Sequence, residues 1–176
     1  FIMEGEGAYT VVDGEKMTMS FGDFVLTPNW TWHDHGSESS GPVGWLDGLD
    51  IPLATLLEGI FFEPYPQESQ TSTKPLNNSV AEYGKGGLLP TWQRSTSSHS
   101  PLLKYAWKDA REAVASLSAN AESPFDGAML EYVNPVNGGP SLSTIASFLQ
   151  KLKPGQKTEA HRHSVSAIYL AVEGYG

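Results

Sequence analysis

The chain has 176 residues, 39% hydrophobic and 18% charged, which is typical of a globular protein of one or two domains. It contains no cysteine, which excludes disulfides, zinc fingers and iron–sulfur clusters and leaves His, Asp and Glu as metal ligands. The net charge is −9 and residues 1–70 hold twelve acidic side chains against one lysine, so we expect neither nucleic acid nor, without a long apolar run, a membrane as partner.

The first fifty residues predict a series of short antiparallel strands. Residues 8–19 alternate apolar and polar side chains on either side of Asp13-Gly14, a dipeptide typical of a two-residue hairpin. A turn at Gly22-Asp23 precedes a short buried strand over residues 24–26, and Pro28 ends it because proline cannot donate to a strand ladder. A further strand is expected over residues 43–49. Such strands favour a mostly β barrel or jelly roll.

The pattern becomes helical after Asp50, where leucines recur at helical spacing. Residues 63–101 carry little periodic signal and are interpreted as a long connector. Residues 104–118 predict an amphipathic helix, and strand-like segments return after residue 127. We therefore expect helices within the connector, between two β-rich parts.

Two His-x-His pairs, in which one residue separates the two histidines, lie toward opposite ends of the chain. His33 and His35 close the stretch GDFVLTPNWTWHDHG, and His161 and His163 follow Gly155 after five residues. On a strand, residues i and i+2 point to the same face, so His161 and His163 would converge inside a barrel. The alternative is a pair on an exposed edge.

The end of the chain repeats its beginning. LAVEGYG, residues 170–176, aligns with FIMEGEG, residues 1–7, and both place E-G-x-G after an apolar strand. The repeat predicts two incomplete copies of one barrel, over residues 1–62 and 128–176, with residues 63–127 as the connector. The chain is then an internal fragment of a longer protein.

These residues carry a family resemblance. Gly155, His161, His163 and Gly174 fit the first cupin motif, G-x5-H-x-H-x3-E-x6-G, with Ala167 in place of Glu. The second motif, G-x5-P-x-G-x2-H, is matched by Gly22, Pro28 and His33, with Trp30 in place of Gly. The chain resembles the cupin superfamily, whose fold is a double-stranded β-helix or jelly-roll barrel. More narrowly, WTWHDHG and WLDGLD resemble the gentisate 1,2-dioxygenase family, which includes salicylate and 1-hydroxy-2-naphthoate dioxygenases.

The resemblance implies a bicupin that binds Fe(II) through three histidines in its first barrel. His33 would be one ligand, with the other two upstream of Phe1, and His161 and His163 would be their counterparts in the second barrel. The implied activity is extradiol-type ring cleavage in aromatic catabolism. Gentisate (2,5-dihydroxybenzoate) and O2 would give maleylpyruvate.

Three further residues are candidates for the site. We expect His35 to handle protons or to hydrogen-bond behind the metal, although a strand-end histidine bonded to backbone fits as well. Asp47 lies in an apolar strand, where a carboxylate needs a partner, and a substrate hydroxyl or a histidine is preferred over a buried salt bridge. Trp30 and Trp32 are expected in the barrel wall, with Trp32 also stacking on the substrate.

Other functions remain open. One is a related salicylate or 1-hydroxy-2-naphthoate dioxygenase, another is a non-catalytic bicupin that binds a small ligand, and a third is a cupin isomerase or decarboxylase that uses Mn or Zn. Retention of His33, His161 and His163 favours an enzyme over a binding protein. We further expect a cytoplasmic homo-oligomer and a 176-residue piece that is inactive by itself.

Overall fold

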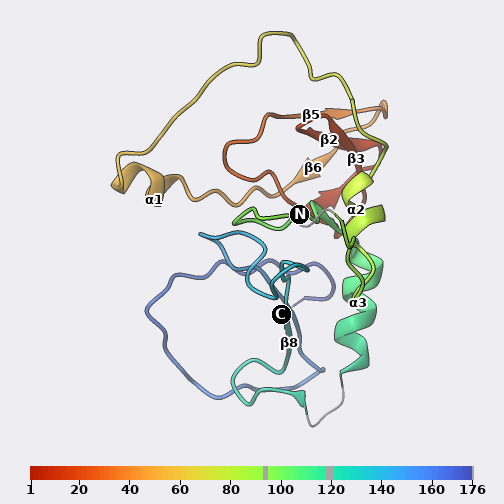
Figure 1. Cartoon of the computed structure of the whole chain (residues 1–176). Coiled ribbons are helices and arrows are strands. Elements are labelled where there is room, and N and C mark those ends of the chain that lie inside the picture. The colour runs from red at the N-terminus through yellow and green to blue at the C-terminus, as the bar shows by residue number, and fades with distance from the viewer. Residues whose placement is uncertain (93–94, 118–120, 176) are drawn as a thin grey trace.

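The computed structural model describes residues 1–92, 95–117 and 121–175. Figure 1 shows the N-terminal strands above, β8 below, and α2 and α3 along one side. No helix among the described residues is long and apolar enough to cross a membrane. The elements are β1 (Ile2–Glu4), β2 (Ala8–Val12), β3 (Glu15–Met19), β4 (Phe24–Val25), β5 (His33–Ser37), β6 (Gly44–Trp45), α1 (Ile51–Leu56), α2 (Asn78–Tyr83), β7 (Lys104–Tyr105), α3 (Trp107–Ser116), β8 (Ala128–Glu131) and β9 (Phe148–Lys151).

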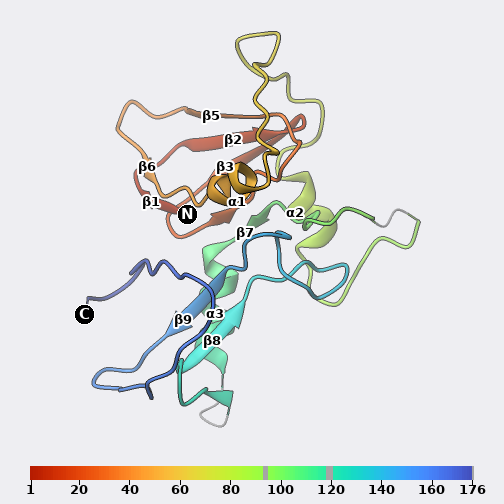
Figure 2. The same cartoon turned by 90° about the vertical axis from the view of Figure 1, so that its left-hand side faces the viewer.

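The expected hairpin at Asp13-Gly14 is confirmed. Both residues have positive φ, 44° and 78°, as the tight turn between β2 and β3 requires. β2 also pairs with β5 on its other side, which gives the strand order β3-β2-β5 (Figure 2). The hairpin therefore provides the platform on which β5 lies.

One face of this sheet is the inner face of the molecule. Alternate residues of β2 and β3 point into it, and all six are at most 5% exposed: Ala8, Thr10, Val12, Glu15, Met17 and Met19. His33 pairs with Val12 and His35 with Thr10. Because directly opposed residues in an antiparallel sheet share a face, both imidazoles lie on the inner face.

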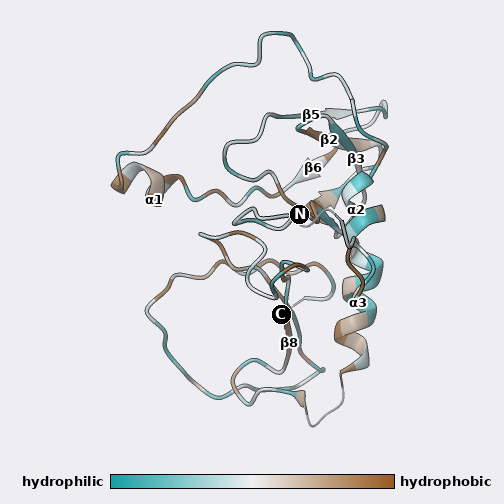
Figure 3. Cartoon of the chain, in the orientation of Figure 1, coloured by the Kyte–Doolittle hydropathy of each residue, from teal (hydrophilic) through white to brown (hydrophobic). Residues whose placement is uncertain are grey.

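An apolar cluster joins the two halves of the chain. Leu26 from the first half and Tyr132 from the second are both buried in it, and the Phe24 and Tyr132 rings lie 4.8 Å apart. At its edge, the Asp23 carboxylate accepts the backbone N–H of Trp107 at 2.9 Å and thereby binds the first turn of α3. Figure 3 shows the hydrophobic colour of β8, which leads into this cluster.

The connector holds more regular structure than its sequence indicates. The short helix α2 was not expected. It is stabilised by a distant residue, because the buried carboxylate of Glu15 accepts the N–H of Ser79 in the first turn of α2. The helix expected over residues 104–118 is shorter, since Lys104–Tyr105 forms β7 with β4 and the helix begins at Trp107. Its predicted end at Ser118 lies outside the described residues. The helix after Asp50 is confirmed as α1.

The second half is more open than predicted. The strand-like segments after residue 127 are confirmed as the antiparallel pair β8 and β9. The strand expected through His161 and His163 is wrong, because the described residues 152–175 form neither helix nor strand. A strand needs a partner for its hydrogen-bond ladder. Within the repeated segment, Gly174 has the same backbone conformation as Gly5, with φ of 86° at both. Gly176, the last residue of the repeat, lies outside the described residues.

Candidate metal and substrate site

The strand that carries His33 and His35 is anchored just before its first residue. The N–H of Asp13 donates to the Trp32 carbonyl at 2.9 Å, and the Asp13 carboxylate accepts the Trp32 N–H at 2.9 Å. The hairpin turn thus holds the chain immediately before His33. The His33 and His35 rings then lie 5.8 Å apart on the inner face.

The His33 ring is oriented by a backbone carbonyl two residues earlier in the chain. Its Nδ1 lies 3.2 Å from the Thr31 carbonyl, and a carbonyl only accepts, so Nδ1 carries the proton. The neutral ring then has its lone pair on Nε2, which is available to a metal. His33 is exposed, so Nε2 is not used up by packing. The donor chemistry of His33 therefore fits one imidazole ligand of Fe(II).

His35 lies between His33 and the Trp45 indole, whose ring centroid is 5.5 Å away. Partial burial lowers the pKa of His35, and the neighbouring His33 lowers it further, while Asp47 and Asp34 oppose this. His35 is therefore a neutral imidazole near pH 7 and can accept a proton.

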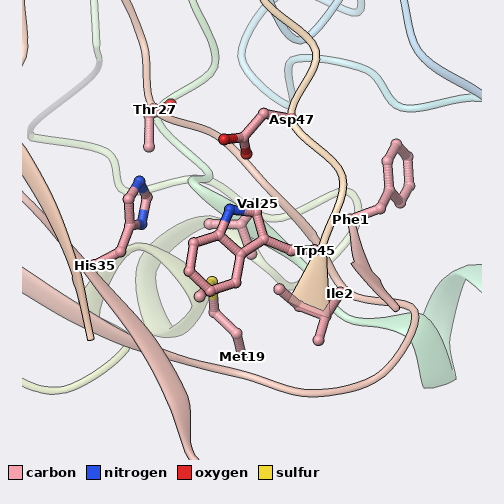
Figure 4. A pocket seen from close by; sticks show the side chains of 8 residues that line it. All are labelled: Phe1, Ile2, Met19, Val25, Thr27, His35, Trp45 and Asp47. Carbon is pink, nitrogen blue, oxygen red and sulfur yellow. The ribbon is translucent and has the colours of Figure 1, made fainter. Parts of the chain in front are cut away.

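A small cavity lies beside His35. Figure 4 shows the His35 imidazole and the Asp47 carboxylate on this cavity together with the Trp45 indole. Its volume is about 40 Å³, room for one or two water molecules, whereas ligand pockets occupy roughly 300 Å³ or more. The cavity is therefore too small to enclose an aromatic acid by itself. The lining residues are Phe1, Ile2, Met19, Val25, Thr27, His35, Trp45 and Asp47.

The surroundings of Asp47 differ from those expected. The strand predicted over residues 43–49 is only β6, Gly44–Trp45, so Asp47 lies past its end and is exposed. An exposed carboxylate needs no buried partner, so the argument from desolvation was wrong. Its charge nevertheless acts on His35 across the cavity.

Trp30 and Trp32 do not form a barrel wall. Trp30 is 81% exposed and has a φ of 64°, which turns the chain instead of continuing a strand. Its ring stacks on Phe61 at 5.3 Å, and Trp32 meets the edge of Tyr65 at 5.1 Å. Both tryptophans thus hold the segment after α1 beside the start of β5.

His161 and His163 are close to each other but exposed. Their rings lie 5.8 Å apart, the same separation as for His33 and His35. The Nδ1–H of His163 donates to the Val165 carbonyl at 2.6 Å, while Nε2 of His161 lies 4.0 Å from the Asp126 carboxylate. Within the described ranges, no three His, Cys, Asp or Glu side chains converge on one metal position. The described residues supply single imidazoles or pairs rather than a full ligand set.

Sequence reasoning missed two residues at the site. Thr27 lines the cavity, and the buried Thr10 donates its hydroxyl to the Asp34 carbonyl at 2.9 Å between the two histidines. The alternation of β2 placed Thr10 on the inner face and could have identified it. Thr27 lies in an irregular segment with no periodic signal.

The comparisons agree with this architecture. Residues 1–49 match the family model described as Cupin domain. The chain is 39% identical to gentisate 1,2-dioxygenase 1 of Aquipseudomonas alcaligenes, over 100% of the chain and 51% of the relative. It is 38% identical to a 1-hydroxy-2-naphthoate 1,2-dioxygenase of Nocardioides sp. (strain KP7), over 100% of the chain and 45% of the relative. The chain spans about half the length of these curated relatives.

Solved structures give the same result. The salicylate 1,2-dioxygenase of Pseudaminobacter salicylatoxidans superposes with a TM-score of 0.71 and 31% identity, over 81% of this chain and 42% of that one. A structure of that enzyme described as adducts with gentisate superposes with a TM-score of 0.70 and 32% identity, over 81% and 41% of the two chains. The cupin fold is thereby confirmed. The chain therefore has the cupin fold and is similar to gentisate, salicylate and 1-hydroxy-2-naphthoate dioxygenases.

Proposed function

We propose that the protein containing this chain is an Fe(II)-dependent ring-cleaving dioxygenase that converts gentisate and O2 to maleylpyruvate. The observation that carries the proposal is the common inner face of His33 and His35, with His35 and Asp47 on one cavity. A metal ligand, a neutral base and a carboxylate are the groups that this reaction needs. The named relatives support the substrate class.

His33 would hold the metal in the first barrel through Nε2, with two further histidines from outside the chain. His161 and His163 would be the corresponding pair in the second barrel, so that residues 1–62 and 128–176 belong to two barrels joined by residues 63–127. Fe(II), when bound, supplies positive charge for a chelating carboxylate and hydroxyl and the redox chemistry with O2. Imidazole ligands suit this metal.

The chain's own residues would bind and orient the substrate. Neutral His35 would accept a proton from a substrate hydroxyl, because its lowered pKa keeps the imidazole unprotonated. Asp47 accepts a hydrogen bond from a second hydroxyl, and Trp32 offers an aromatic face. Both atoms of O2 enter the product, so no external reductant is required.

Turnover by the full-length protein tests the activity. After anaerobic loading with Fe(II), we expect one O2 consumed per gentisate and a ring-opened product that absorbs in the near ultraviolet. Cleavage of salicylate or 1-hydroxy-2-naphthoate without cleavage of gentisate would show that the proposed substrate is wrong. If the iron-loaded protein cleaves no aromatic acid, the enzyme proposal is wrong and the alternative of a non-catalytic binding protein holds.

A histidine substitution tests the metal assignment. His33→Ala in the full-length protein should abolish iron binding in the first barrel, measured as iron per chain after gel filtration. His99→Ala is the matched control, because His99 is bonded to the Ser97 hydroxyl at 2.8 Å and belongs to no part of the site. Stoichiometric iron in the first barrel of His33→Ala would refute the assignment.

A further inference from the structure

β5 is an edge strand of its sheet. The described strand order is β3-β2-β5, so β2 is the one ladder partner that β5 has there. An edge strand with a single partner is free to shift or tilt unless other contacts hold it. The positions of His33 and His35 therefore depend on whatever else binds β5.

Asp34, between the two histidines, is held from both faces. On the inner side, the buried Thr10 hydroxyl donates to the Asp34 carbonyl at 2.9 Å. On the outer side, the Asp34 carboxylate accepts the backbone N–H of Gln70 at 2.7 Å. Because side chains alternate along a strand, fixing Asp34 outward fixes both imidazoles inward.

Gln70 is itself fixed to the hairpin. Its side-chain N–H donates to the Val11 carbonyl at 3.1 Å, and its side-chain oxygen accepts the Gly14 N–H at 3.2 Å. One residue of the connector thus binds β5, β2 and the turn after β2. Val11, whose side chain is on this outer face, is only 3% exposed, so the face is covered.

The connector continues along the hairpin beyond Gln70. The backbone N–H groups of Thr73 and Lys74 both donate to the Gly14 carbonyl, at 2.9 and 3.1 Å, and that of Asn77 donates to the Lys16 carbonyl at 2.9 Å. Gln70 is thus the first residue of a segment with several backbone attachments. A segment held in this way is rigid enough to position the carboxylate that it binds.

We propose that Asp34 and Gln70 are positioning residues that orient His33 and His35 from the opposite face of β5. Neither side chain lies on the inner face, so both act through the strand. The inference rests on the proposed function only in taking His33 as a metal ligand. Partners that orient metal ligands in this way are worth roughly 10–100-fold in metal affinity or activity.

Cobalt binding to the full-length apoprotein tests the proposal. We expect Asp34→Ala to weaken Co(II) binding about 10–100-fold and to change the Co(II) absorption bands, which report ligand geometry. Asp34→Asn keeps an oxygen that accepts the Gln70 N–H, so it should restore most of the affinity. Glu38→Ala is the matched control, because it removes an exposed carboxylate just after β5 that pairs with Lys16, and it should bind Co(II) like the wild type.

Two outcomes would overturn the proposal. One is wild-type Co(II) affinity and spectrum in Asp34→Ala, even with lowered thermal stability, because the contact would then be structural only. The other is a loss in Asp34→Asn as large as in Asp34→Ala. If Asp34→Ala does not fold, Gln70→Ala decides, since it keeps the N–H to Asp34 and loses the two side-chain anchors. It should weaken Co(II) binding severalfold, and unchanged binding refutes the role of Gln70.

Failure of the proposed function gives a different pattern. If His33→Ala binds Co(II) as the wild type does, the metal assignment has failed. If no aromatic acid is turned over while Asp34→Ala still weakens Co(II) binding, the positioning role holds and only the reaction is wrong.

Discussion

Replacement of Glu15 should lower the free energy of unfolding by a measurable amount. The Glu15 side chain is on the inner face and 2% exposed, and its carboxylate accepts the backbone N–H of Ser79 at 2.8 Å and the Ser79 hydroxyl at 2.7 Å. The same hydroxyl accepts the Leu103 N–H at 3.3 Å. One carboxylate therefore connects β3, α2 and the chain before β7.

The magnitude follows from these contacts. A hydrogen bond to a charged group contributes about 1.5–3 kcal/mol, and a donor left without a partner in the interior costs about 1–3 kcal/mol. Glu15→Ala removes two such bonds and leaves the Ser79 N–H unpaired. Since water partly fills the space, we expect a loss of about 3–5 kcal/mol in the free energy of unfolding.

Urea unfolding of the full-length protein measures this loss. Glu15→Gln keeps one oxygen acceptor and should lose about 1–2 kcal/mol, because the bonds are no longer charge-assisted. Glu38→Ala breaks an exposed pair and should lose at most about 1 kcal/mol. A loss below about 1 kcal/mol in Glu15→Ala, or one equal to that of Glu38→Ala, would refute the reasoning.

Three further predictions concern the core and the site. Gly22→Ala should cost about 3 kcal/mol or more by urea unfolding, because φ is 79° and an added Cβ would lie 2.5 Å from the Trp107 ring; a loss under about 1 kcal/mol would contradict this. Burial, and to a lesser extent Asp23, raises the pKa of Tyr132 to about 12, so its folded-state ionisation should be missing at pH 10–11 in ultraviolet titration compared with Tyr132→Phe. The stability that neutral Tyr132 contributes is complete below its unfolded pKa of about 10 and is lost as pH rises through about 12; normal titration near 10 would refute its burial. Trp32→Ala should raise KM for gentisate about tenfold with kcat little changed, while Trp32→Phe keeps most of the affinity; an unchanged KM would exclude Trp32 from substrate binding.

The local features of the first half could be read directly from the sequence. The Asp13-Gly14 turn depends on two residues that tolerate positive φ, and the alternation on either side of it places Thr10 and Met17 inward. Each of these depends on neighbours in the chain, which is why periodicity finds them.

The features that depend on distant partners could not be predicted in this way. The pairing of β5 with β2 puts His33 opposite Val12, and the contact of Asp34 with Gln70 joins residues 36 positions apart. The same dependence explains the failure at His161, where the spacing suits a strand but the described residues offer no ladder.

The sequence by itself therefore determined the family resemblance, the hairpin and the two histidine pairs, because motif spacing and turn chemistry are local. Only the tertiary structure decided that His33 and His35 face inward, that Asp47 is exposed beside His35, and that the connector holds β5 from behind. These features depend on which strands pair and which loops pack back against the sheet, and they are fixed by hydrogen bonds between segments that are distant in the sequence.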